Sequence, residues 1–99
     1  MNCETIRNAK SDEMIYFLLS AYWEAAQIET VLPEALRSLP ITGLDNMKAR
    51  HWQLLMLLVT EPALPEASRA LLKEALQVVH VALGRLYALE RAQGRVLQR

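Results

Sequence analysis

The chain is poor in the residues that build disulfides, multi-thiolate metal sites and phosphate loops. Its single cysteine, Cys3, excludes an internal disulfide and a zinc site made of several cysteines. Its three glycines, Gly43, Gly84 and Gly94, are isolated, so there is no glycine-rich loop of the kind that cradles a phosphate. The longest charge-free apolar region of the first half, residues 14–23, is shorter than the roughly 20 residues that cross a bilayer. We therefore expect no membrane association.

Histidines are also scarce, and neither of the two stands in a metal-binding pattern. A carboxylate metal site in a helical bundle uses a glutamate with a histidine three residues later. At that spacing, however, Lys48 precedes His51 and Gln77 precedes His80. No nucleophile stands beside a base in a known catalytic motif. We therefore expect a protein that is not an enzyme and that uses no metal and no cofactor.

Neither sign of charge dominates the chain. Its 11 basic and 11 acidic residues give a formal net charge of zero, so nothing attracts the whole chain to nucleic acid or to an anionic membrane. Weak repulsion between copies is compatible with self-association. The first ten residues are polar, unlike a secretory signal, and a reducing compartment suits the lone thiol. We expect a cytoplasmic protein.

Apolar residues recur at helical spacing along most of the chain. In the last third they advance in alternating steps of four and three, which places them on one side of a long helix over residues 65–93. The members of this row are Leu72, Leu76, Val79, Leu83 and Leu86. Similar apolar faces predict helices over residues 11–30 and 45–60, and Pro33 opens a short helix over residues 33–39. The expected fold is all-α, a small helical bundle of three main helices plus one short helix, with sequential helices as antiparallel neighbours.

The same pattern divides the chain into three segments. Residues 1–10 are expected to form a flexible N-terminal arm, residues 11–93 a single helical-bundle domain, and residues 94–99 a basic C-terminal end. Ser11 and Asp45 are residue types that cap helix N-termini, so we expect helices to begin directly after them.

The apolar face of each helix predicts a core. A wide apolar stripe on a helix is a face that other protein must cover. The expected core residues are Phe17, Leu18, Ala21, Ala25, Ile28, Leu36, Leu39, Trp52, Leu55, Met56, Val59, Leu72, Leu76, Val79, Leu83 and Leu86.

The chain is richer in apolar residues than one small bundle needs. They make up 53% of the sequence, above the usual range of about 45–50%. Large rings with polar tips are enriched at the centres of binding surfaces. We therefore expect a non-enzymatic interaction module, such as an adaptor, chaperone-like protein or regulator, that self-associates, with a dimer favoured and a further protein partner possible. The candidate interface residues are Tyr16, Tyr22, Trp23, Leu54, Leu57 and Leu58.

A second interpretation uses the arginines at the end of the chain. Arg91, Arg95 and Arg99 are four residues apart, so a continuing helix would place them in one row suited to phosphates. Arginines near a helix C-terminus also suit the helix dipole without any ligand. A nucleic-acid-binding regulatory protein is therefore the alternative, and nucleic acid is the less favoured partner.

Overall fold

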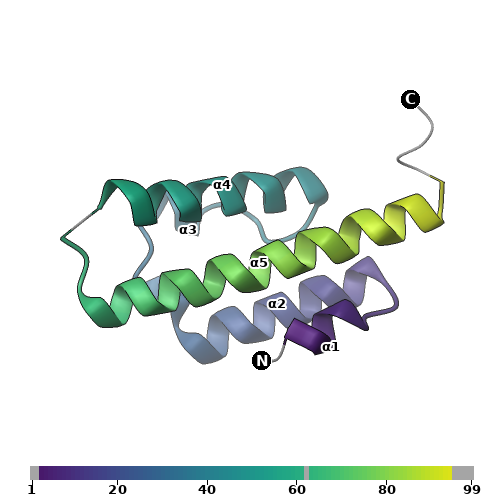
Figure 1. Ribbon diagram of the computed structural model, residues 1–99, viewed down its shortest axis with the longest axis horizontal. Helices are drawn as coiled ribbons and strands as arrows, with labels where there is room; N and C mark the ends of the chain where they lie inside the picture. The colour runs from purple at the N-terminus through teal and green to yellow at the C-terminus, as the bar shows by residue number, and fades with distance from the viewer. Residues whose placement is uncertain (1–2, 62, 95–99) are drawn as a thin grey trace.

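The computed structural model describes residues 3–61 and 63–94, and this part of the chain is helical with no strand (Figure 1). The described helices are α1 (Cys3–Arg7), α2 (Asp12–Ala26), the short 3-10 helix η1 (Ile28–Thr30), α3 (Glu34–Arg37), α4 (Leu44–Thr60) and α5 (Glu66–Ala92). The all-α prediction is confirmed, and so are the three main helices within a few residues at each end.

Helix α5 is the element around which the others are arranged. Its 27 residues give a rod of about 40 Å. Figure 1 shows α4 on one side of this rod and α1 with α2 on the other, and all three helices contact α5. The predicted row on α5 is confirmed, since Leu72, Val79, Leu83 and Leu86 are buried and Leu76 is half-buried.

The N-terminal residues differ from the expected arm. Cys3–Arg7 form the helix α1, in which Ile6 is fully buried, and Ala9 is buried just beyond it. The Arg85 Nε donates a hydrogen bond of 2.8 Å to the Ala9 carbonyl oxygen, which ties this segment to α5. A five-residue helix with one buried apolar side chain has no periodicity that a sequence pattern could reveal.

The helix ends show one cap that was predicted correctly and one that was not. The Ser11 hydroxyl accepts a hydrogen bond of 3.2 Å from the Met14 amide at the start of α2, as expected. Asp45 is not a cap, because α4 begins one residue before it and follows Gly43. Gly43 has a φ of 88°, a conformation that glycine adopts without strain. Helix α2 also ends early, since Gln27 turns left-handed with a φ of 55°.

The predicted core is correct on α5 and wrong on much of α2 and α4. Ile28 and Leu36 are buried as expected, and Leu18, Leu39 and Leu55 are half-buried. The predicted core residues that lie exposed instead are Phe17, Ala21, Ala25, Trp52, Met56 and Val59. On α4 the buried residues are Met47, Arg50 and Leu54, which lie on the opposite side of the helix from the predicted face.

No helix in the described part of the chain is both long and apolar enough to span a membrane.

Candidate interaction surface on helix α4

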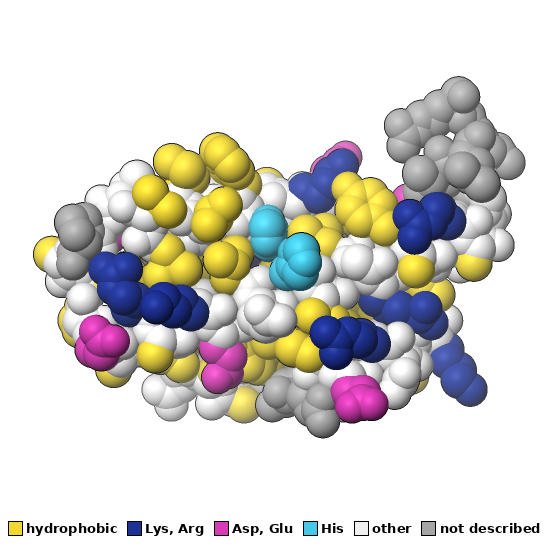
Figure 2. Space-filling model, in the orientation of Figure 1, with side chains coloured by type: hydrophobic (Ala, Val, Ile, Leu, Met, Phe, Trp, Pro, Cys, Tyr) yellow, Lys and Arg dark blue, Asp and Glu magenta, His cyan; other side chains and the backbone are white. Residues whose placement is uncertain are grey.

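The outer side of α4 carries a row of exposed apolar side chains. Trp52 is 61% exposed and Val59 is 69% exposed, with Met56 between them. Steps of four and three residues place these three on one face of the helix, and the half-buried Leu55 adjoins them. We call these four residues the α4 stripe. Figure 2 shows hydrophobic side chains gathered over α4 on this side of the molecule.

The core holds this row on the outside. Met47 and Leu54 on the inner side of α4 are fully buried, and Arg50 between them is only 1% exposed. A rotation of α4 that brought Trp52 inward would therefore expose two core side chains and clash with close-packed neighbours. Large apolar groups at adjacent positions on one surface are typical of a binding site.

The interface residues expected from the sequence lie elsewhere. Tyr22, Trp23 and Leu54 are buried in this subunit, so the structure places them in the core. Leu57 and Leu58 are half-buried and pack against the core, and so does Tyr16 on α2. The structure thus exchanges the two sides of α4, because the residues expected inside are exposed and those expected at an interface face inward.

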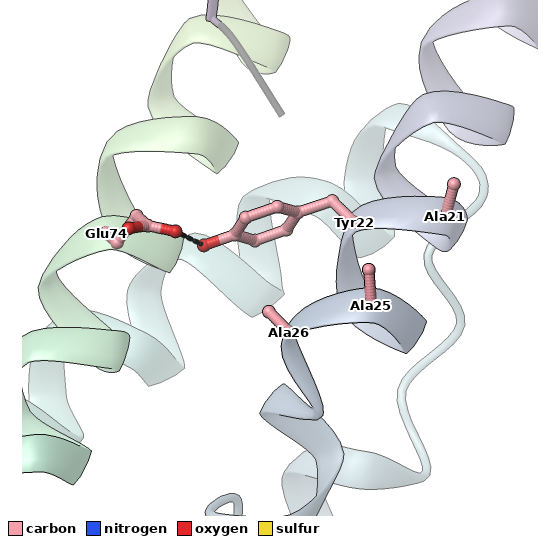
Figure 3. A pocket seen from close by; sticks show the side chains of 5 residues that line it. All are labelled: Ala21, Tyr22, Ala25, Ala26 and Glu74. Carbon is pink, nitrogen blue, oxygen red and sulfur yellow. Dashed lines mark hydrogen bonds between the residues drawn. The ribbon is translucent and has the colours of Figure 1, made fainter.

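A shallow groove between α2 and α5 contains a hydrogen-bonded tyrosine and glutamate (Figure 3). The Tyr22 hydroxyl donates a 2.8 Å hydrogen bond to Glu74 Oε1. Burial raises the pKa of Tyr22 above its ordinary value, and the hydrogen bond and negative charge of Glu74 raise that pKa further. The remaining lining is the methyl groups of Ala21, Ala25 and Ala26. The hydrogen bond between Tyr22 and Glu74 joins α2 to α5.

The two histidines, far apart in the sequence, meet at the junction of α4 and α5. The ring centroids of His51 and His80 are 5.7 Å apart, and Figure 2 shows the two rings side by side. Burial lowers the pKa of His51 from its ordinary value, and the neighbouring charge of His80 lowers that pKa further. The pair is not a metal centre of three or more ligands, since no such group of His, Cys, Asp and Glu occurs among the described residues.

The predicted phosphate-binding row is represented by one residue. Arg91 is exposed near the end of α5, whereas Arg95 and Arg99 lie outside the described residues.

Comparison of the chain with protein families, with curated proteins and with solved structures finds no match.

Proposed function

We propose that this protein is a non-enzymatic helical interaction module that self-associates as a dimer through the α4 stripe. The observation that carries the proposal is the exposed row of Trp52, Met56 and Val59. Tryptophan is among the residues most enriched at the energetic centres of protein interfaces. A cytoplasmic location is part of the proposal, since a reducing compartment suits the free thiol of Cys3.

The stripe is suited to meet a second copy of itself. In a two-fold dimer the same patch faces itself on both subunits. An antiparallel pair of α4 helices, centred between Leu55 and Met56, places Trp52 against the partner's Val59 and Val59 against the partner's Trp52. The large ring of each copy then covers the smaller side chain of the other. A zero net charge adds little repulsion as the copies approach.

The size of the stripe limits the strength of such a dimer. Four side chains are far fewer than the roughly 20–30 residues per side of a standard stable interface. The row from Trp52 to Val59 also covers only about 10 Å of helix. We therefore expect a weak dimer with a Kd in the micromolar range or above. Residues around the stripe would supply further contact.

Sedimentation equilibrium over a wide concentration range tests this proposal with a matched pair of variants. Val59→Glu places a charge in the stripe. Phe17→Glu places the same charge on α2, at a side chain whose exposed fraction of 70% matches the 69% of Val59. We expect Val59→Glu to weaken dimerisation at least about tenfold, since burying an unpaired carboxylate costs more than 1.4 kcal/mol. Phe17→Glu should dimerise like the unmodified protein.

Two results would contradict self-association through the stripe. One is an unmodified protein that stays monomeric at millimolar concentration. The other is an equal loss of dimer in Val59→Glu and Phe17→Glu, which would place the interface away from α4.

A further inference from the structure

A second surface lies along the outward side of α5, where two hollows meet at His80. The first, between α4 and α5, has a volume of about 310 Å³, and the second, between α1 and α5, has a volume of about 340 Å³. The first is lined by His51, Leu55, Lys73, Leu76, Gln77 and His80. The second is lined by Arg7, His80, Val81, Gly84, Arg85 and Ala88. We call the two together the α5 trough. From Lys73 to Ala88 it follows α5 for about 22 Å.

The charges along this trough have one sign. The cations that line it are Arg7, Lys73 and Arg85, and none of the described lining residues is acidic. In the described part of the chain, neither Lys73 nor Arg7 forms an ion pair with a carboxylate. Figure 2 shows basic side chains on both sides of the two histidines. Because the whole chain is neutral, this concentration of cations is a local feature that attracts an anionic ligand.

Gly84 lies in the lining of the second hollow, and no close packing within the subunit requires a glycine at this position. A glycine inside a helix costs about 1 kcal/mol relative to alanine. Such a glycine is often explained by close packing, yet a Cβ at position 84 would meet no atom within 4 Å. With Ala88 one turn further on, Gly84 leaves the α5 backbone open to close approach by a ligand.

The lining of the trough is partly apolar. Leu55 and Leu76 line the first hollow and Val81 lines the second. Phosphates gain nothing from leucine side chains, whereas the apolar face of an amphipathic helix does. Arg85 is also partly engaged with the Ala9 carbonyl, which leaves few cations for a nucleic-acid backbone. A length of about 22 Å corresponds to four turns of helix.

From these observations we propose that the α5 trough binds an acidic amphipathic helix of a partner protein. The apolar face of that helix rests on Leu55, Leu76 and Val81, and its carboxylates face Lys73 and Arg7. The site uses the side of α5 between α4 and α1. It shares Leu55 with the α4 stripe but does not require self-association through that stripe.

The probe is an 18-residue synthetic peptide with leucines on one helical face and glutamates on the other. Its binding to the full chain is measured by calorimetry beside a peptide with lysine in place of glutamate and a duplex DNA of 20 base pairs. We expect the acidic peptide to bind one per chain and to weaken as salt is added. The lysine peptide and the DNA should bind at least tenfold more weakly.

Matched variants locate the site. Lys73→Glu reverses a charge in the trough, and Arg37→Glu makes the same change in net charge on α3. We expect Lys73→Glu to weaken peptide binding at least tenfold and Arg37→Glu to change it less than twofold. Gly84→Gln, which fills the second hollow with a good helix former, should also weaken binding while leaving the fold intact.

Three outcomes would overturn the proposal: no binding of the acidic peptide at several hundred micromolar, tighter binding of the DNA, or equal effects of Lys73→Glu and Arg37→Glu. Repeating the titration with Val59→Glu separates this proposal from the previous one. Because Leu55 belongs to both surfaces, the monomeric variant should bind the peptide at least as tightly as the unmodified protein does. Weak peptide binding by both proteins would count against the trough alone, and an unchanged dimer in Val59→Glu would count against the stripe alone.

Discussion

The guanidinium group of Arg50 on α4 lies over the indole ring of Trp23 on α2, with 5.2 Å between the guanidinium carbon and the ring centroid. Both side chains are buried, and Arg50 Nη2 donates a hydrogen bond to the Leu39 carbonyl oxygen. Burial lowers the pKa of Arg50, and the negative charge of Glu29 opposes that shift. The attraction between a cation and an aromatic face reaches about 2 kcal/mol when both are desolvated. It offsets part of the cost of placing a charge in the core.

The packing of Arg50 and its charge are expected to have opposite effects on stability. Arg50→Ala should lower the free energy of unfolding by about 2–5 kcal/mol, because it leaves a cavity between α2 and α4. Arg50→Met keeps most of the volume and removes a buried charge that has no carboxylate within ion-pair distance in the described chain. It should therefore lie within about 1 kcal/mol of the unmodified protein. Urea denaturation measures both values. Equal losses in the two variants would show that the charge and its hydrogen bond matter more than the packing.

Arg50 also explains why α4 was predicted with the wrong side inward. The existence and length of α4 could be predicted, because apolar periodicity and the prolines on either side of it mark its extent. Its orientation could not, because Leu54 and Leu58 on one side are as apolar as Trp52 and Val59 on the other. An arginine in the middle of a helix face normally indicates that this face is exposed to solvent. Arg50 becomes an inner residue because Trp23 on α2 and the Leu39 carbonyl oxygen, both distant in the sequence, receive its guanidinium group.

The candidate sites were harder to predict than the helices, because they form only when separate helices pack together. His51 and His80 are 29 positions apart, and nothing in their local sequence indicates that they meet. The α5 trough likewise needs α1, whose Arg7 lies in a segment that was expected to be an arm. By contrast, the buried row of α5 was correctly predicted, because its outer side is polar enough to leave one choice of face.

The hydrogen bond between Tyr22 and Glu74 should contribute measurably to stability and should be sensitive to alkali. Tyr22→Phe is expected to cost about 1 kcal/mol, the net value of one such bond. The pKa of Tyr22 is raised in the folded state, so stability is fully present below the ordinary tyrosine pKa of about 10. Above that value the unfolded chain loses its proton while the folded chain keeps it, and stability falls.

A spectrophotometric titration at 295 nm follows this tyrosine. We expect a component that ionises later than a free tyrosine, and this late component should vanish in Tyr22→Phe and persist in Tyr87→Phe. Glu74→Gln removes the charge and should move the ionisation of Tyr22 back toward ordinary values. If the folded protein shows no component that ionises later than a free tyrosine, the raised pKa of Tyr22 is wrong.

The histidine pair predicts a loss of stability in mild acid. Since the folded state lowers the pKa of His51, the unfolded chain binds more protons below the ordinary histidine pKa of about 6.5. Stability is therefore fully present above pH 6.5 and falls as the pH falls toward the lower folded value. The effect should stay below about 1 kcal/mol, because the ring of His51 is only half-buried and water screens it.

Proton NMR of the imidazole resonances tests this histidine directly. The midpoint for His51 should lie below that of a free histidine, and it should rise in His80→Gln, which removes the neighbouring charge. His51→Gln should lessen the fall in stability between pH 7 and pH 5.5. A midpoint for His51 that is ordinary in the unmodified protein and unchanged in His80→Gln would contradict the interaction between the rings.

Substitution of Gly84 is expected to move the stability of the fold and the binding of the peptide in opposite directions. Gly84→Ala should raise the free energy of unfolding by about 0.5–1 kcal/mol, because alanine is the better helix former and its methyl group meets no other atom. If Gly84 had no role in binding, its replacement would raise stability and leave peptide binding unchanged. If Gly84 keeps the trough open, the more stable variant should bind the acidic peptide more weakly, as Gly84→Gln should to a greater degree. Thermal unfolding and calorimetry on the same samples measure both effects. A gain in stability with unchanged peptide binding in both variants would remove Gly84 from the proposed site.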